Sequence, residues 1–323
     1  MTRILIIGAG AVGATLAWHL SGTRAEVALL ARGARRAALQ DKGLSLWRAG
    51  RLLGTRAISL PARAEGDWDA VLLCVKQYDL PALLPTLAPL GDSPLVPMVN
   101  GVPWWLLRSH PLLREREDWG EFYGGFPAMP AERLMGAVVY IPAQLRDACN
   151  VEQGGRDTLA LGEIDGQPSA RLRKLAAAIN ASGLQCRASS HIQADIWNKL
   201  LGNATFNPVS ALARATMHQM LAGPGLRRLC ARLIGELMAV GHALGYEESQ
   251  GVEGRLRQAE SAGHARTSML QDALAGRPLE GEALVGILTR MAAHLGIPAP
   301  TLDSVWALLE SRFPAGGARS PGA

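Results

Sequence analysis

The stretch IWNKLLGNATFNP, residues 196 to 208, combines an ammonium group with several carboxamides. Lys199, Asn203 and Asn207 are spaced i, i+4 and i+8, so a helix would align them on one face with about 6 Å of rise per step. The chain has only four lysines among its 33 basic residues, and three of its six asparagines are in this stretch. Such a stripe could simply face water, but asparagine is a poor helix former. The pattern therefore favours a functional face.

The chemistry that suits this face is reduction of a ketone. Hydride transfer to the carbonyl carbon creates an alkoxide, which needs a proton donor. A lysine ammonium supplies both the positive charge and the proton, and burial can lower its pKa toward the working range. Arginine stays protonated and cannot replace it. We also expect Pro208 to kink or end the helix because it removes a backbone donor, which leaves the direction of Asn207 less defined than that of Asn203.

A glycine-rich loop near the N-terminus predicts dinucleotide binding. It lies between a predicted strand, 3–7, and a predicted helix, 11–20. In the pattern G-x-G-x-x-G, the first glycine permits a tight turn, the second lets the backbone approach a pyrophosphate, and the third lets the helix pack on the strand. A purely structural turn is the alternative. The residues expected to bind the cofactor here are Gly8, Ala9, Gly10, Ala11, Val12 and Gly13.

The end of the second predicted strand, 25–31, indicates which dinucleotide binds. A free ribose 2′-hydroxyl usually meets an acidic residue here, whereas a 2′-phosphate meets arginine. The sequence reads LLARGARR, with Arg32, Arg35 and Arg36 at this end and Glu26 at the opposite end. NADP(H) is therefore favoured over NAD(H), although a solvated basic turn would look the same.

Two polar residues end the next predicted strands. Lys76 follows strand 69–75 and Asn100 follows strand 93–99. Ligands bind at the carboxyl ends of the strands in open parallel sheets, so both residues are candidates for the cofactor side. Asn100–Gly101 is also an ordinary turn dipeptide.

Strand and helix patterns alternate along the first part of the chain. Further strand-like pieces occur over 134–162, and a helix is expected over 171–179, whereas 79–90 is a weak, proline-interrupted helical segment. Alternation implies right-handed crossovers and an α/β, Rossmann-like, doubly wound parallel sheet.

The pattern becomes helical after about residue 190. We expect an NADP-binding Rossmann domain over residues 1–188 and an all-helical substrate and catalytic domain over 189–313. The tail, 314–323, is rich in glycine and proline with nothing to bury, so it is expected to be disordered.

Composition narrows the partners. The 323 residues are 48% hydrophobic and 19% charged, with a formal net charge of +5. The basic residues are scattered, which disfavours nucleic acid and suits a small anionic molecule. No apolar run is long enough for a signal peptide or a bilayer span, so we expect a cytoplasmic protein without a membrane partner. No cluster of residues has metal-ligand spacing. The cysteines read as reduced, buried thiols, at Cys74, Cys149, Cys186 and Cys230.

Taken in order, several segments resemble the ketopantoate reductase (2-dehydropantoate 2-reductase) family. They are GAGAVG, Arg32, VLLCVKQYD, MVNGV, IWNKLLGNATFNPVSAL and TSMLQDALAGRPLE, and the resemblance runs from about residue 3 to residue 312. It implies a Rossmann domain followed by a helical domain like that of 6-phosphogluconate dehydrogenase. It also implies NADPH-dependent reduction of 2-dehydropantoate to pantoate, for the pantothenate and coenzyme A pathway, in a cleft between the domains.

The resemblance implies roles for individual residues. Lys199 would be the general acid. Glu280 would hold the distal hydroxyl of the substrate, and it is expected among both the catalytic and the cofactor-binding residues. From the sequence alone, Glu280 could instead complement a helix dipole, and Ser268 could be a helix N-cap in a capping box with Gln271. The implied substrate ligands are Asn203, Asn207, Ser268 and Asn100, and Arg32, Lys76 and Asn100 would serve the cofactor.

Two departures from the family keep other functions open. A further asparagine of the family has no equivalent near Met217–His218, and the segment 106–134, preceded by VPWW, is longer than expected. The long segment is either a surface excursion with a packed aromatic pair or a lid that shapes the substrate site. The alternatives are a reductase of another 2-oxo acid and a non-catalytic NADP(H)-sensing protein, which would not need a proton donor. A homodimer is a further option.

Overall fold

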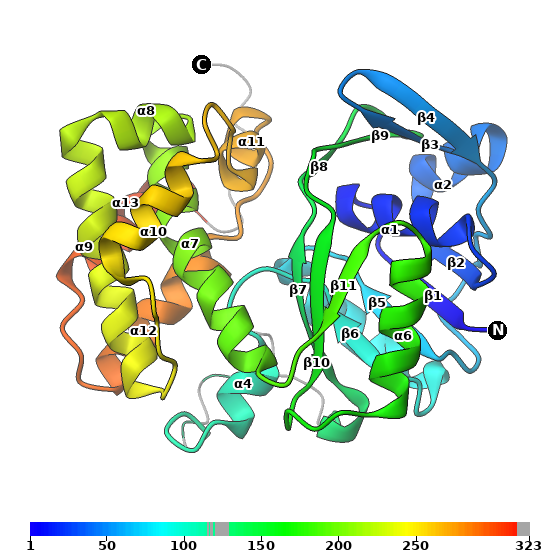
Figure 1. Ribbon diagram of the computed structural model, residues 1–323, viewed down its shortest axis with the longest axis horizontal. Helices are drawn as coiled ribbons and strands as arrows, with labels where there is room; N and C mark the ends of the chain where they lie inside the picture. Colours follow the sequence, from blue (N-terminus) through cyan, green and yellow to red (C-terminus); the bar gives the residue numbers. More distant parts are fainter. Residues whose placement is uncertain (115, 117–118, 120–128, 315–323) are drawn as a thin grey trace. The chain divides into compact units, whose positions relative to one another are not determined.

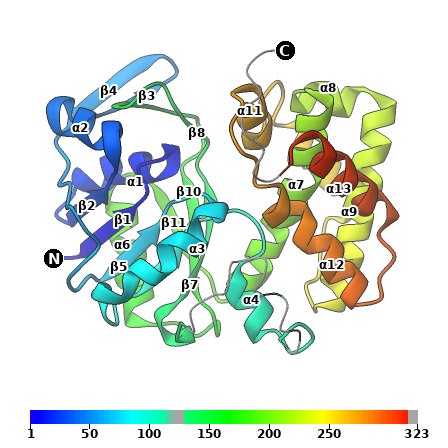
Figure 2. The same ribbon diagram turned by 180° about the vertical axis from the view of Figure 1, so that it is seen from behind.

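The computed structural model describes residues 1–114, 116, 119 and 129–314. Contacts divide the chain into two compact units, each assembled from two separate segments of sequence. The first unit comprises Met1–Val99 and Gly125–Ile196, and the second comprises Asn100–Gly124 and Trp197–Ala323. Figures 1 and 2 show the chain from opposite sides. The tail beyond Pro314, which we expect to be disordered, lies outside the described residues.

A four-stranded parallel sheet is the centre of the first unit. Its strand order is β2 (Glu26–Leu30), β1 (Arg3–Ile7), β5 (Ala70–Leu73) and β6 (Leu95–Pro97). These strands are short apolar runs, as strands buried on both faces of a parallel sheet should be. The predicted strands are confirmed, and so is the Rossmann-like fold class.

Helices cover both faces of this sheet, which makes it doubly wound. In Figure 1, α1 (Ala11–Ser21) and α6 (Ala170–Ala181) lie on one face, and Figure 2 shows α3 (Leu80–Leu83) on the other. The weak helical segment expected over 79–90 is observed as α3 between two 3-10 turns, η1 (Gln77–Asp79) and η2 (Leu84–Leu90). A third 3-10 turn, η3 (Ala131–Arg133), comes later in the chain.

A second sheet has mixed strand directions. Its order is β11 (Gln185–Ala188), β10 (Thr158–Glu163) and β7 (Met135–Tyr140). β10 is parallel to β11 and antiparallel to β7. The helix α6 connects β10 to β11, so these three elements form a β-α-β unit.

The elements that were not predicted include a third sheet and the helix that precedes it in the chain. The sheet has the order β4 (Arg51–Arg56), β3 (Leu44–Arg48), β9 (Asn150–Gln153) and β8 (Ala143–Leu145). The helix is α2 (Gly33–Lys42). It is mostly polar, and Leu39 is its one buried residue. These strands are short and rich in polar residues, so no apolar period marks them in the sequence.

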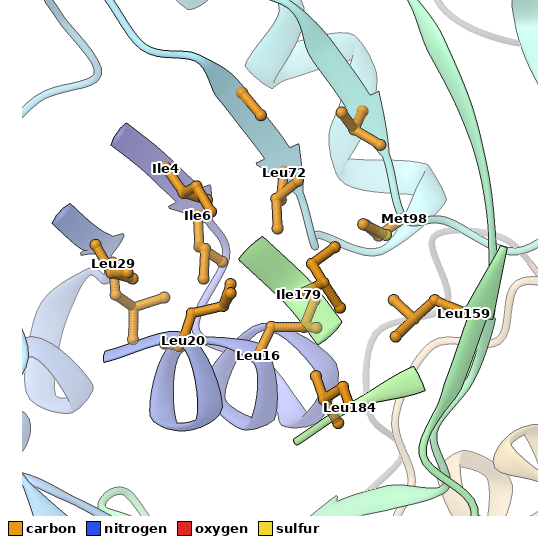
Figure 3. Close-up of a cluster of buried hydrophobic side chains, with 14 of the residues drawn as sticks. Ile4, Ile6, Leu16, Leu20, Leu29, Leu72, Met98, Leu159, Ile179 and Leu184 are labelled. Carbon is orange, nitrogen blue, oxygen red and sulfur yellow. The ribbon is translucent and has the colours of Figure 1, made fainter. Parts of the chain in front are cut away.

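Aliphatic side chains from the parallel sheet, its helices and the mixed sheet form one continuous core in the first unit. Ile4 and Ile6 of β1, Leu72 of β5 and Leu16 of α1 are each completely buried. Figure 3 shows these residues among their neighbours, with Leu20, Leu29, Met98, Leu159, Ile179 and Leu184 labelled beside them.

The described elements of the second unit are all helical. One cap within it is unusual, because the Glu236 carboxylate accepts hydrogen bonds from the backbone N–H groups of Thr301 and Leu302, at 2.9 and 2.8 Å. The helices are α4 (Trp104–Ser109), α7 (Ile192–Ala213, which starts in the first unit), α8 (Met217–Ala222), α9 (Pro224–Ala243), α10 (Gly251–Glu260), α11 (Ser268–Leu274), the π-helical turn η4 (Glu282–Gly286), α12 (Ile287–His294) and α13 (Pro300–Arg312).

No helix within the described ranges is both long enough and apolar enough to cross a membrane.

Candidate active site

Lys199, Asn203 and Asn100 come together around one oxygen atom. The Lys199 Nζ donates a hydrogen bond to the Asn100 Oδ1 over 3.0 Å. The Asn203 Nδ2 donates to the same oxygen over 3.4 Å. Both donors come from one face of α7, because they are four residues apart on the helix. A carbonyl oxygen thus lies at the centre of the polar face that the sequence predicts.

The third residue of the stripe, Asn207, is buried, with 6% of its surface exposed. We expected Pro208 to kink or end the helix, and it does not end it, since α7 continues through it to Ala213. Proline removes one backbone hydrogen bond, but the turns around it are fixed by packing, with Val209 and Ser210 almost completely buried. Asn207 therefore keeps its place on the helix.

The electrostatic surroundings of Lys199 suit proton transfer. Burial lowers the pKa of its ammonium group to about 8, while the negative charge of Glu280 acts in the opposite direction. Glu280 is itself buried, with 7% of its surface exposed. A lysine with this pKa exists in both protonation states near neutral pH, as a general acid requires.

The loop that carries Asn100 is fixed to the π-helical turn η4. Gly101 has φ +94°, a conformation that favours glycine. A Cβ atom on Gly101 would lie 2.5 Å from the carbonyl oxygen of Ala283. The next residue, Val102, donates its backbone N–H to that same oxygen over 3.3 Å. The backbone of this loop is therefore tightly defined.

Ser268 is the first residue of α11, and it is exposed. The capping role considered for it is wrong: the N-cap is Thr267, whose hydroxyl accepts a hydrogen bond from the backbone N–H of Leu270 over 3.1 Å. Two adjacent hydroxyl residues look equivalent in the sequence. The Thr267 hydroxyl also donates to the Ser210 Oγ over 3.1 Å, which ties the start of α11 to α7.

Two further contacts hold the start of the Lys199 segment, and no pattern in the sequence indicates them. The Arg255 guanidinium donates to the Asn198 backbone oxygen over 3.1 Å and to its side-chain oxygen over 2.8 Å. Arg255 also pairs with the buried carboxylate of Glu248. The Trp197 ring stacks on Tyr246, with centroids 5.5 Å apart.

The glycine loop has two kinds of glycine. A Cβ atom on Gly8 would lie 2.7 Å from the Cys74 carbonyl oxygen, and one on Gly13 would lie 2.0 Å from the Gly8 oxygen. The fold itself therefore requires both glycines. At Gly10 the nearest atom would be 3.8 Å away, which is an ordinary contact. Packing therefore does not require glycine at this position, where the sequence predicts the close approach of a pyrophosphate to the first turn of α1.

The three arginines after β2 differ in their surroundings. Arg35 donates to the Asp147 backbone oxygen over 3.1 Å, and Arg36 donates to the Pro61 backbone oxygen. Arg32 is exposed at the N-cap position of α2. It thus fits a 2′-phosphate better than the other two do. At the far end of β2, Glu26 forms an ion pair with Arg3 over 2.9 Å.

Lys76 lies three residues beyond the end of β5, where η1 begins. This position is close to the glycine loop in the sheet, because Ile7 pairs with Leu73 and the Cys74 N–H donates to the Ile7 oxygen over 2.8 Å. Lys76 therefore follows a strand whose carboxyl end is next to that of β1.

Both tryptophans of the VPWW motif are buried. Trp104 and Trp105 are buried in α4, with 2% and 4% of their surfaces exposed. His110 further anchors the segment through a 3.1 Å hydrogen bond between its Nε2 and the Leu244 backbone oxygen. The lid interpretation depends mostly on residues 115, 117–118 and 120–128, which lie outside the described part of the chain.

The four cysteines are unpaired thiols. Burial raises the pKa of the Cys74 thiol to about 12, so it stays protonated. Within the described ranges, no three His, Cys, Asp or Glu residues are grouped so that they could hold a metal ion.

Comparison with known proteins identifies the chain. The family described as "Ketopantoate reductase PanE/ApbA" matches residues 4–166, and "Ketopantoate reductase PanE/ApbA C terminal" matches residues 191–312. A 2-dehydropantoate 2-reductase from Mesorhizobium japonicum is 36% identical over 315 residues, which are 95% of this chain and 96% of the relative. This chain belongs to the ketopantoate reductase family. The family consists of nicotinamide-dependent oxidoreductases that act on CH–OH groups, so the chain is an enzyme.

Solved structures agree with the ketopantoate reductase fold. A crystal structure from Ralstonia solanacearum MolK2, whose assignment as a ketopantoate reductase is provisional, has a TM-score of 0.88 and 36% identity. It covers 96% of this chain and 97% of its own. A D-mandelate dehydrogenase with NADH and anilino(oxo)acetate has a TM-score of 0.82 and 21% identity, with coverage of 96% and 98%. The latter likeness shows the shared fold alone.

Proposed function

We propose that this enzyme reduces 2-dehydropantoate to pantoate with NADPH, as a step toward pantothenate and coenzyme A. The observation that supports this most is the polar face of α7, where the Lys199 ammonium and the Asn203 carboxamide share the Asn100 oxygen. A sensor would have no use for an ammonium whose pKa is lowered to about 8. Family membership supplies the substrate class.

Lys199 acts as the general acid in this proposal. The nicotinamide, when bound, supplies a hydride to the ketone carbon. The Lys199 ammonium stabilises the negative charge that develops on the substrate oxygen and then gives that oxygen its proton. Asn100 accepts a hydrogen bond from the ammonium group, and Asn203 donates to the same Asn100 oxygen. After transfer, the neutral amine is tolerated because burial already disfavours its charge.

The remaining polar residues bind the substrate. Asn203, Asn207 and Ser268 offer neutral donors and acceptors for the carboxylate and hydroxyl groups of a 2-oxo acid. Glu280, buried and negatively charged near Lys199, holds the distal hydroxyl. We place these groups in the helical domain, residues 189–313. Asn100 lies outside that range but belongs to the same compact unit as Lys199.

The cofactor residues belong to the Rossmann domain, residues 1–188, in the same proposal. Gly10 leaves room for a pyrophosphate at the first turn of α1, and Lys76 follows the neighbouring strand. Arg32, exposed at the end of β2, gives the 2′-phosphate a positive partner. NADPH is therefore preferred to NADH.

A second candidate is reduction of a different 2-oxo acid on the same fold. The lack of the family's further asparagine near Met217–His218 favours it. Met217 is buried there, and the backbone N–H of His218 is used in a 2.7 Å hydrogen bond to the Gly263 oxygen. Neither side chain offers a carboxamide, which favours a substrate with a less polar tail.

A substrate panel tests the proposal. NADPH oxidation is followed with 2-dehydropantoate and with simpler branched and aromatic 2-oxo acids. We expect the highest kcat/KM for 2-dehydropantoate, and a Lys199→Ala variant should lose about 10²- to 10⁴-fold in turnover while keeping its NADPH affinity. Higher kcat/KM for another acid would select the second candidate. Near-normal turnover of Lys199→Ala would remove the general-acid assignment.

A further inference from the structure

The loop 100–102 and the π-helical turn η4 meet in a contact that the reaction itself does not explain. Val102 donates its backbone N–H to the Ala283 oxygen over 3.3 Å. Val102 and Ala283 are 1% and 3% exposed, so this hydrogen bond is shielded from water. Losing it would leave two buried polar groups unpaired, which costs more than losing an exposed bond.

Only glycine at position 101 lets this contact form. Its φ of +94° is costly for residues with a Cβ atom. In addition, a Cβ atom there would lie 2.5 Å from the Ala283 oxygen and 3.0 Å from the Ala283 Cβ. Any side chain at this position would push loop and turn apart by a substantial fraction of an ångström.

The π-helical winding of η4 positions the Ala283 backbone oxygen, which accepts the hydrogen bond from Val102. A π turn shifts the hydrogen-bond partner of each carbonyl from the fourth to the fifth following residue, and such turns recur at functional sites. The same segment carries Glu280, whose backbone oxygen accepts from the Leu284 N–H over 3.1 Å. The carboxylate that acts on Lys199 and the oxygen that receives the loop are therefore three residues apart on one short segment.

On the other side of the contact is Asn100, the direct neighbour of Gly101. Its Oδ1 accepts from the Lys199 Nζ over 3.0 Å and from the Asn203 Nδ2 over 3.4 Å. A displacement of 1 Å would lengthen the first bond beyond hydrogen-bond distance. The backbone of residues 100–102 thus sets the position of the oxygen that receives the ammonium.

We propose that Gly101 and the Ala283 carbonyl act together as positioning residues, which hold the Asn100 carboxamide against the Lys199 ammonium. This inference rests on the proposed role of Lys199 as the general acid. Without the contact, the ammonium loses an acceptor that favours its charged form. Its pKa then falls below the value of about 8 in the intact enzyme. Less of the acid is protonated at neutral pH, and reduction slows.

The test uses the full-length chain with a Gly101→Ala substitution. The matched control is Gly235→Ala on α9, where an added Cβ atom meets nothing within 4 Å. One readout needs neither cofactor nor substrate: the pH dependence of amine labelling, resolved by mass spectrometry, titrates each lysine separately. With only four lysines, Lys174 serves as the internal reference, because it is partly exposed in an ion pair with Asp69. The second readout is kcat against pH.

We expect Gly101→Ala to move the labelling midpoint of Lys199 to lower pH and to reduce kcat by about 10- to 100-fold. Lys174 and the Gly235→Ala control should be unchanged. If Gly101→Ala does not fold, Ala283→Gly decides, because it keeps both hydrogen-bonding groups and loosens the turn; a smaller shift in the same direction is expected. A folded variant with an unchanged midpoint and kcat would overturn the inference. Near-normal turnover of Lys199→Ala would instead overturn the general-acid role on which the inference rests, whatever the midpoint does.

Discussion

The Lys199 Nζ lies 3.0 Å from the Asn100 Oδ1, although the two residues are 99 positions apart in the chain. Asn100 follows the strand β6 in sequence but belongs to the same compact unit as Lys199. The residue at the end of a Rossmann strand therefore sits beside the candidate acid, in reach of its ammonium.

The rate of ketone reduction should fall above about pH 8. Lys199 must be protonated to act as an acid, and burial lowers its pKa to about 8, so the active form is lost as the pH rises through that value. Oxidation of the alcohol needs the neutral amine and should rise through the same range. Glu280→Gln removes the charge that raises this pKa, and its basic limb should move to lower pH. If the residual activity of Lys199→Ala still falls above the same pH, the basic limb of the pH–rate profile belongs to another group.

Replacing Arg32 with aspartate should change the cofactor preference. Arg32 is exposed at the N-cap position of α2, at the end of β2, and a carboxylate there would repel a 2′-phosphate. We expect Kd for NADPH to rise by at least 10-fold while Kd for NADH changes little, as measured by fluorescence titration. Arg24→Asp, at a position before β2, is the control. Equal losses for both nucleotides would exclude a role for Arg32 at the 2′ position.

Gly10→Ala and Gly13→Ala should fail in different ways. A Cβ atom on Gly13 would be 2.0 Å from the Gly8 oxygen, so this variant should be unstable, with a lower Tm. A Cβ atom on Gly10 has no contact closer than 3.8 Å, so the Tm should be preserved while NADPH binding weakens. Thermal denaturation and nucleotide titration separate the two effects. Unimpaired NADPH binding by Gly10→Ala would contradict the close approach of the pyrophosphate.

Removing the Arg255 guanidinium should destabilise the helical unit. Arg255 and Glu248 are buried, with 12% and 6% of their side-chain surfaces exposed. Arg255→Met leaves the Glu248 carboxylate buried without its cationic partner, which typically costs about 3–5 kcal/mol. Hydrogen exchange of α7 amides reports this unit directly. Adding Glu248→Leu should restore much of the protection, whereas Arg290→Met, at an exposed ion pair, should have little effect. Unchanged exchange in Arg255→Met would show that the ion pair is dispensable.

Local patterns in the sequence were sufficient to predict the parallel sheet and the polar face of α7. Strands such as RILII and AVLL are apolar throughout, and the loop after β1 has glycines at a recognisable spacing. The third sheet was missed because strands such as RLLGTR and NVEQ mix charged and apolar residues. Their pairing depends on partners far away in the chain, which no local period shows.

The detailed arrangement of the candidate site depends on tertiary contacts. Pro208 was expected to kink or end α7 because an isolated helix would break there, but the helix continues to Ala213 through a turn whose residues are buried. Thr267 and Ser268 have equal capping potential in the sequence, and only the Ser210 hydroxyl distinguishes them. The hydrogen bond between Lys199 and Asn100 links segments 99 residues apart, so no spacing rule could have found it.

The winding of residues 282–286 has a bearing on how such enzymes could diverge. A π turn contains one residue more than the α-helical turn it replaces. Deleting that residue would restore regular winding and rotate everything before it, including Glu280, by about 100° around the helix axis. The apolar face of α12 would stay in register, so the fold could survive the change. A single codon lost or gained at this point could thus exchange the side chain that faces the lysine, which is a short evolutionary route to a new substrate.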